Sequence, residues 1–153
     1  MPVWLQVLLA VVTPVIAMAG VAVAFQQRQL AQRNLKHALF DRRWAVYAAT
    51  NDVLVTFING NRGEQSQRLA EFLRRKMDAQ FLFDAGLLHY LEEIQDAVHR
   101  YRSAFRALQS ERPRSSDERS SDEAAVISGA ETLRSLHKDL VGQFRPSLAL
   151  DQI

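Results

Sequence analysis

The sequence has no cysteine, few residues that break helices, and one long stretch without charge. The lack of cysteine excludes disulfides, thiolate metal sites and a cysteine nucleophile. Only 6 glycines and 4 prolines occur among 153 residues, so most of the chain is free to form helices. No glycine-rich phosphate loop and no nucleophile elbow is present. These absences predict an all-α protein that is not an enzyme and that holds no cofactor or metal ion.

The uncharged stretch is Val3–Phe25, VWLQVLLAVVTPVIAMAGVAVAF. A helix of about 23 residues is long enough to cross a hydrocarbon core of about 30 Å. We therefore expect residues 1–25 to form a single-pass transmembrane anchor. A cleaved signal peptide is the alternative, because Ala17-Met18-Ala19 has the small residues of a cleavage site. The basic residues of a signal peptide are missing, however, and apolar residues continue to Phe25.

Basic residues cluster directly after this stretch, although the formal net charge of the chain is only +2. Between residues 26 and 43, Asp41 is the only acid, and the basic residues are Arg28, Arg33, Lys36, Arg42 and Arg43. By the positive-inside rule, the N-terminus lies outside and the remaining chain lies in the cytoplasm. The lipid bilayer is thus an expected partner, with Arg28 and Arg33 as candidate contacts to lipid headgroups.

After the anchor we expect a helical juxtamembrane stalk over residues 26–38 and a cytoplasmic, antiparallel bundle of three to four helices over 39–153. Apolar residues recur at spacings of three, four and seven up to Ile58, which indicates one helix entering the bundle. Gly60 is placed to end that helix in a left-handed conformation. Asn61 and Glu64 have the spacing of a capping box for the second helix. The apolar run Phe81–Phe83 is predicted to be its buried end.

The third helix has the most regular pattern, with Asp84 as its expected N-cap. Its apolar residues alternate in steps of four and three: Leu87, Leu91, Ile94, Val98, Tyr101, Phe105 and Leu108. Such a seam is typical of coiled-coil packing. The seam packs either inside the bundle or against another subunit, and the few helices available favour the first.

Residues 111–122 are polar and predict a flexible linker. Ser120 and Glu123 have capping-box spacing and are expected to open the last helix. Pro146 is expected to end it. His137 falls in the apolar register of this helix, so we expect a histidine at the core edge with a hydrogen-bond partner.

Residues 39–47, LFDRRWAVY, resemble the motif Leu-Phe-Asp-Arg/Lys-Arg-aromatic-x-Val-Tyr. This motif belongs to a group of small, uncharacterised bacterial membrane proteins with one N-terminal span and a helical cytoplasmic region. Phe81-Leu82-Phe83-Asp84 is similar to the group's Phe-Leu-Phe-Gly segment, and Phe144-Arg145-Pro146 to its closing Phe-x-Pro-Tyr-Leu, with Ser147 in place of Tyr. The resemblance implies a location in the bacterial inner membrane and leaves the activity open.

The charged triplet Asp41-Arg42-Arg43, with Trp44 and Tyr47 beside it, is the sharpest polar feature. One interpretation is a structural lock in which Asp41 pairs with an arginine of another helix, and the two arginines pair with acids such as Glu92, Glu93 or Asp96. The other is a surface for an acidic partner.

Two pairs, His37 with Asp41 and His89 with Glu93, have the spacing of two metal ligands on one helical face. Two ligands alone do not make a site, and such pairs are common on exposed helices. Nucleic-acid binding is not expected, because the bundle lacks a basic face.

We therefore expect a membrane-anchored helical interaction or scaffolding module whose partner is another protein or a second copy of the chain. The alternative is an oligomeric membrane-perturbing effector or pore-forming protein, which Gln6, Thr13 and Pro14 in the anchor favour. A third hypothesis is an enzyme or small-molecule sensor with a polar pocket around Arg42, His89 and Glu93.

Overall fold

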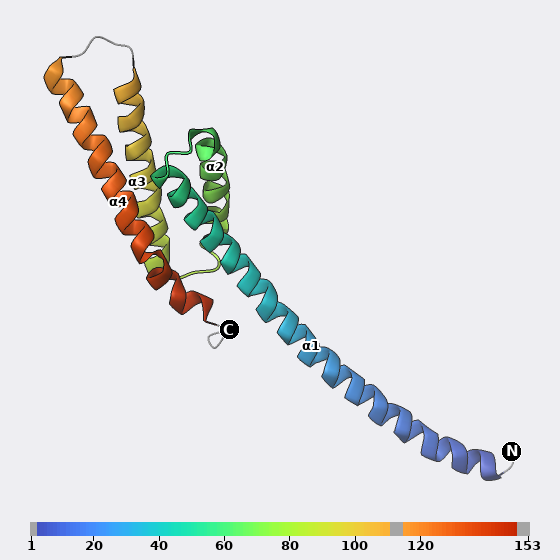
Figure 1. Cartoon of the computed structure of the whole chain (residues 1–153). Coiled ribbons are helices and arrows are strands. Elements are labelled where there is room, and N and C mark those ends of the chain that lie inside the picture. The colour runs from blue at the N-terminus through green and yellow to red at the C-terminus, as the bar shows by residue number, and fades with distance from the viewer. Residues whose placement is uncertain (1–2, 111–114, 150–153) are drawn as a thin grey trace. The chain divides into compact units, whose positions relative to one another are not determined.

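The computed structural model describes residues 3–110 and 115–149, without the side chains of residues 3–22, 29, 32 and 33. Four α-helices make up this part of the chain. They are α1 (Val3–Ile58), α2 (Arg62–Ala79), α3 (Ala85–Gln109) and α4 (Ser116–Leu148). The prediction of an all-helical protein is confirmed for the described residues (Figure 1).

The chain divides into two compact units, Met1–Leu39 and Phe40–Ile153. In the described residues, the first unit is the N-terminal part of α1. The second unit is a helical bundle that contains the rest of α1 and all of α2, α3 and α4. The stalk predicted over residues 26–38 and the bundle predicted over 39–153 stay predictions.

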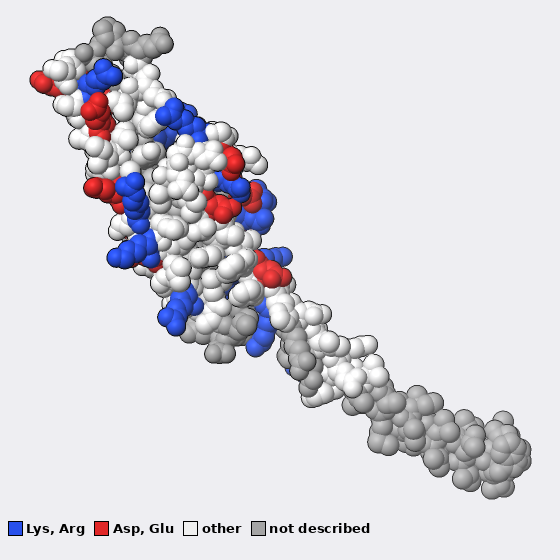
Figure 2. Space-filling model, in the orientation of Figure 1, with Lys and Arg blue, Asp and Glu red and all other residues white. Residues whose placement is uncertain are grey.

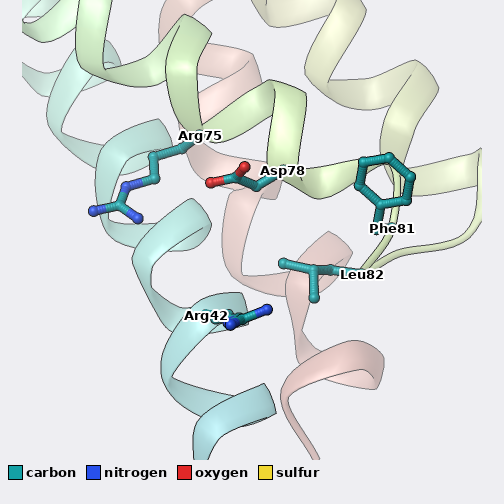
Figure 3. A pocket seen from close by; sticks show the side chains of 5 residues that line it. All are labelled: Arg42, Arg75, Asp78, Phe81 and Leu82. Atoms are coloured by element: carbon teal, nitrogen blue, oxygen red, sulfur yellow. The ribbon is translucent and has the colours of Figure 1, made fainter.

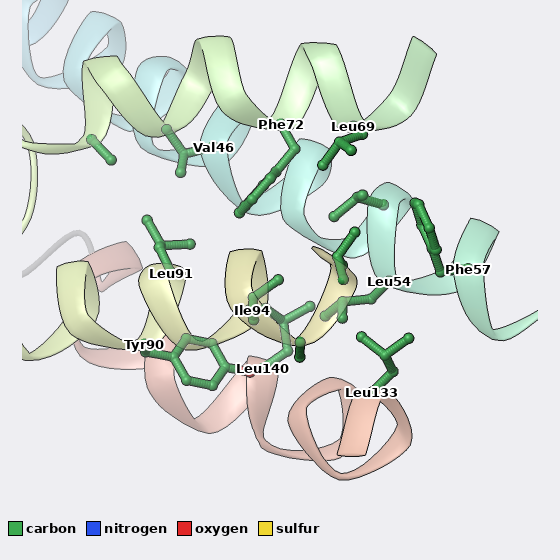
Figure 4. Close-up of a cluster of buried hydrophobic side chains, with 14 of the residues drawn as sticks. Val46, Leu54, Phe57, Leu69, Phe72, Tyr90, Leu91, Ile94, Leu133 and Leu140 are labelled. Carbon is green, nitrogen blue, oxygen red and sulfur yellow. The ribbon is translucent and has the colours of Figure 1, made fainter. Parts of the chain in front are cut away.

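The bundle packs around one apolar core to which all four helices contribute. Successive helices run in opposite directions, joined by short connections after α1 and α2 (Figure 1). Val53, Leu54 and Phe57 of α1 are at most 1% exposed and belong to the same core cluster as Phe72 of α2. Figure 4 shows Leu54, Phe57 and Phe72 among the buried side chains. The core residues of the other helices include Leu91, Ile94 and Val98 of α3 and Leu133, Leu140 and Phe144 of α4. Four helices thus share one core, at the upper end of the predicted three to four.

The turn between α1 and α2 differs in one detail from the prediction. Gly60 has φ 70°, the left-handed conformation expected after the end of α1. Asn61 occupies the N-cap position of α2, but its side chain makes no capping hydrogen bond. The predicted capping box with Glu64 is therefore wrong, because the Glu64 carboxylate accepts from Arg68 one turn further along.

The prediction for the end of α2 is also wrong. The helix ends at Ala79, and Phe81 is 84% exposed, whereas Leu82 and Phe83 are half-buried. Three consecutive residues of a turn point in different directions, so a continuous apolar run does not place all of its members in the core.

The start and seam of α3 follow the sequence closely. Asp84 caps the helix, since its Oδ1 accepts a hydrogen bond from the Leu87 backbone N–H at 2.9 Å. Leu87, Leu91, Ile94 and Val98 are buried in the core of the bundle. The later seam residues are half-buried: Tyr101, Phe105 and Leu108. The seam packs within the chain over its first half.

The start of α4 lies five residues earlier along the chain than predicted. Ser115 and Glu118 form the capping box, with the Ser115 hydroxyl accepting from the Glu118 N–H at 3.2 Å. The sequence contains this pattern twice, and the first copy places Asp117 and Glu118 in the first turn, where the helix dipole favours acids. The predicted linker 111–122 is therefore helical from Ser116 onward; residues 111–114 lie outside the described part.

Pro146 does not end α4, which continues to Leu148. Proline removes one N–H from the helix and leaves the carbonyl four residues earlier without its usual partner. Leu148 packs against the core and Ser147 is held by a hydrogen bond from Arg43, so tertiary contacts keep this last turn helical.

Within the part of the chain that the structure describes, no helix has the length and apolar character needed to cross a membrane. The backbone of the predicted anchor Val3–Phe25 is part of α1, but the side chains of residues 3–22 lie outside the described ones. The anchor therefore stays a prediction.

Candidate interaction surface

The five residues singled out in the first helix are distributed around α1 rather than gathered on one face. Each step along a helix turns the side chain by about 100°. Asp41 and Arg42 are exposed, Arg43 and Tyr47 are half-buried, and Trp44 is 48% exposed. The helix therefore separates the triplet into groups with different surroundings.

Arg43 joins α1 to the end of α4. Its Nη1 donates a hydrogen bond to the Ser147 carbonyl oxygen at 2.8 Å, and its guanidinium lies 6.0 Å from the ring centroid of Phe83. Its Nε is buried without a hydrogen-bond partner among the described residues. A cation at the C-terminus of a helix stabilises the carbonyl groups that have no partner inside the helix. Arg43 is thus a structural lock, with a backbone carbonyl in place of the predicted carboxylate.

Next to Arg43, a series of aromatic rings extends from the surface of α1 into the core. Trp44 lies between Phe40 and Tyr47, with ring centroids 6.3 Å and 5.0 Å apart respectively. Tyr47 packs edge-to-face on Phe144 at 5.4 Å, and Phe83 does the same from the other connection at 5.5 Å. The series links a partly exposed Trp44 to a fully buried Phe144, so it fixes this end of the bundle.

Arg42 lines a pocket of about 380 Å³ with Arg75 and Asp78 of α2 and with Phe81 and Leu82 (Figure 3). We call this the Arg42 pocket. The Asp78 carboxylate and the Arg75 side chain lie on the α2 side, and the Phe81 ring and Leu82 lie at the other side (Figure 3). The pocket therefore combines guanidinium groups, one carboxylate and exposed apolar surface.

The two arginines of the Arg42 pocket differ in their partners. Arg75 Nε donates to Glu71 Oε1 at 2.9 Å. Arg74 also binds Glu71, at 2.7 Å, and this hydrogen bond, followed by the one from Arg75, holds the pKa of the Glu71 carboxyl below its usual value. Arg42 makes no salt bridge with any residue that the structure describes. Arg75 is thus paired within α2, whereas no described acid is paired with Arg42.

The acids predicted to pair with Arg42 and Arg43 do not do so. Within the described chain, neither arginine forms a salt bridge to Glu92, Glu93 or Asp96. Glu93 instead lies 3.4 Å from His89 on the exposed face of α3. Arg42 faces α2, and Arg43 faces the end of α4, so the acids of α3 are not their neighbours. In the described part of the chain, the residues that line a pocket with Arg42 belong to α2 and the loop after it, and they do not include His89 or Glu93.

The histidines follow the predictions in part. His137 Nε2 lies 3.1 Å from the Asn51 side-chain oxygen, which confirms a half-buried histidine with a hydrogen-bond partner at the core edge. Over residues 3–110 and 115–149, no group of three or more potential metal ligands occurs where side chains are described. Figure 2 shows basic and acidic side chains interspersed over the visible face of the bundle.

The candidate lipid contacts lie in the N-terminal unit. The side chain of Arg28 is exposed, and that of Arg33 lies outside the described residues. Their contact with headgroups stays a prediction.

Four residues of this end of the bundle were not identified from the sequence as site residues: Arg75, Asp78, Phe81 and Ser147. Arg75 and Asp78 belong to a helix face dense in charges, where nothing marks one pair for a pocket. Phe81 was assigned to the core. Asp84, the N-cap of the next helix, comes only three residues after Phe81. This short distance is a signal that the chain at Phe81 is already in the turn between the helices.

The arrangement can bind an acidic group next to an apolar one. Arg42 supplies a fork of N–H donors, and Phe81 and Leu82 supply apolar surface beside it. Comparison with family profiles, with characterised proteins and with solved structures found no match to this chain.

Proposed function

We propose that this protein is a membrane-anchored helical interaction module, held at the cytoplasmic face of a bacterial inner membrane by Val3–Phe25. The proposed partner is a protein segment that carries a carboxylate beside an apolar side chain. The Arg42 pocket is the observation that carries this proposal. The uncharged N-terminal stretch and the basic residues after it support the location.

The composition of the Arg42 pocket favours a protein partner. Phe81 is 84% exposed, although burying a phenylalanine side chain is worth about 1.5–3 kcal/mol. Large exposed apolar side chains beside polar groups are typical of protein interaction sites. Arg42 gives such a site its preference for acidic partners, because arginine pairs with carboxylates through two parallel hydrogen bonds.

The rest of the bundle supplies a rigid support for this surface. Arg43 and the aromatic series hold α4 against α1 at the same end of the bundle. A preorganised surface loses less conformational entropy on binding than a mobile one. The Arg42 pocket therefore binds the partner, and the contact of Arg43 with the end of α4 positions the pocket.

Affinity purification of the full chain from detergent tests the proposal. We expect one protein to copurify with the wild type, and expect Arg42→Glu or Phe81→Ala to reduce its recovery at least tenfold. Arg134→Glu and Ile127→Ala are matched controls on α4, both at exposed positions, and should leave recovery unchanged. A monomeric mass together with no copurifying protein would contradict the proposal. A defined multiple of the chain mass would identify a second copy as the partner.

The alternative, a membrane-perturbing or pore-forming effector, rests on anchor residues whose side chains are not described. Overexpression in cells loaded with a membrane-potential dye distinguishes the two functions. An interaction module leaves the potential unchanged, whereas an effector collapses it.

A further inference from the structure

A second pocket lies where α2 begins, beside the C-terminal half of α3. Its volume is about 170 Å³, and its lining includes Arg62, Ser66, Tyr101, Arg102, Phe105 and Arg106. We call this the three-arginine pocket. It shares no residue with the Arg42 pocket and is not part of the proposed function.

The described residues that line the three-arginine pocket include three arginines and no acid. Across the described residues, Arg62, Arg102 and Arg106 form no salt bridge. The other arginines of α2 do pair: Arg68 with Asp52 and Glu64, and Arg74 and Arg75 with Glu71. The acid in the first turn of α2 is thus already bound by Arg68 and does not neutralise the pocket.

Contacts with neutral groups hold two of these guanidinium groups in place. Arg62 lies over the Phe105 ring, 4.6 Å from its centroid, and Arg102 Nη2 donates to Ser66 Oγ at 3.3 Å. Phe105 stacks on Tyr101 at 6.1 Å, and Tyr101 packs edge-to-face on the core residue Phe57 at 6.2 Å. The rings therefore connect the cations to the core, and neither contact cancels a charge.

We infer that the three-arginine pocket binds the phosphate group of a soluble, phosphate-bearing small molecule. The planar fork of arginine matches phosphate oxygens through paired hydrogen bonds, and several arginines together offset the charge of a phosphoryl group. Like charges held close together repel one another, and a bound anion relieves that repulsion. Arg62 also lies in the first turn of α2, where the helix dipole favours an anion.

The size of the pocket limits what it takes. Sites that enclose a drug-sized ligand measure about 300–1,000 Å³. A volume of about 170 Å³ is below that range, so the pocket accommodates a phosphate or pyrophosphate group and leaves the rest of a larger ligand outside. The pocket then recognises the phosphate or pyrophosphate group, and the exposed rim of the pocket can contact the rest of the ligand.

Calorimetric titration of inorganic pyrophosphate into the full chain, in a non-ionic detergent at fixed ionic strength, tests this inference. We expect saturable binding with one site per chain. Arg102→Gln and Arg106→Gln should each raise the dissociation constant for pyrophosphate at least tenfold. Arg100→Gln is the matched control, because Arg100 is exposed on the same helix and does not line the pocket.

Thermal unfolding of the wild type gives a readout that needs no variant. A ligand that binds the folded state raises the melting temperature, so pyrophosphate should raise it above that in sodium chloride of equal ionic strength. No saturable binding, or equal weakening by Arg100→Gln, would show that the inference is wrong. Binding to vesicles containing phosphatidic acid without binding to pyrophosphate would also overturn it, since the source of the phosphate would then be a lipid.

Discussion

Arg42 and Arg43 are neighbours in the sequence, yet their guanidinium groups have different surroundings. Arg43 is half-buried and bound to the Ser147 carbonyl, whereas Arg42 is exposed in a pocket. The difference follows from the rotation of about 100° between adjacent helical residues. A positioning role and a binding role are therefore separable by single substitutions.

Arg43→Met should lower the free energy of unfolding by about 1–3 kcal/mol, the usual cost of losing a hydrogen bond to a charged group. Methionine fills similar space without donating to the Ser147 carbonyl. Arg42→Met is the matched control and should change stability by less than about 0.5 kcal/mol, as exposed substitutions do. Urea unfolding of both variants measures this, and equal losses would contradict the assignment of the lock to Arg43.

The surroundings of Tyr90 change the proton affinity of its hydroxyl group. It is 5% exposed, and its hydroxyl donates to the Leu136 carbonyl oxygen. Burial, followed by the charges of Asp139 and Glu93, raises the pKa of Tyr90 well above its ordinary value of 10.0. The folded chain therefore keeps this proton at a pH where the unfolded chain loses it.

The contribution of Tyr90 to stability should be complete below pH 10 and decrease as the pH rises further. The unfolded state ionises first, and ionisation favours unfolding by at most about 1.4 kcal/mol per pH unit. Tyr90→Phe removes this dependence, so the advantage of the wild type over the variant should shrink between pH 8 and pH 11. Denaturant unfolding at the two pH values measures it. An unchanged difference would show that Tyr90 ionises alike in both states.

At the scale of the helix, the N-cap residues of α2 and α3 differ in whether their side chains cap the helix. Asp84 and Asn61 occupy the same position relative to their helices, and both residue types are favoured there. Only Asp84 makes the capping hydrogen bond. Sequence predicts the position of a cap, but the backbone conformation before the helix decides whether the side chain reaches the N–H.

Asp84→Ala should therefore cost about 1 kcal/mol of stability, the usual value for a lost cap. Asn61→Ala should cost less than about 0.5 kcal/mol, because no side-chain hydrogen bond is lost. Thermal unfolding of the two variants under identical conditions gives the comparison. A larger loss for Asn61→Ala would show that its side chain caps α2 in solution.

The α3 helix was predictable almost completely, and the α2 helix was not. The seam of α3 repeats without fault, and its first four members are buried in the core. The α2 helix carries eight charged residues among its 18, and its buried residues are Leu69, Phe72 and Ala79. A helix with few core residues gives a weak periodic signal, so its end was misplaced into Phe81–Phe83.

At the scale of the whole molecule, the chain divides between Leu39 and Phe40 into two units. The second unit has its own core, built from all four helices. The proposed anchor belongs to the first unit. We therefore expect the two units to have different functions: the first attaches the chain to the membrane, and the second binds the partner.

Deleting residues 1–25 tests the location. The full chain should sediment with membranes and resist extraction at alkaline pH, as single-pass proteins do. The truncated chain should remain in the supernatant and keep its helical circular dichroism spectrum. Finding the full chain in the supernatant would show that Val3–Phe25 does not insert.

The sequence alone determined the helical class, the cap at Asp84, the turn at Gly60, the seam of α3 and the partnered state of His137. These features depend on the spacing of apolar residues and on backbone preferences, both of which are set by residues close together in the sequence. Tertiary structure decided that Arg43 binds the end of α4, that Arg42 faces α2, and that three arginines of α2 and α3 line one pocket. Those facts depend on which helices become neighbours and at what rotation, and that is set by the packing of the whole core.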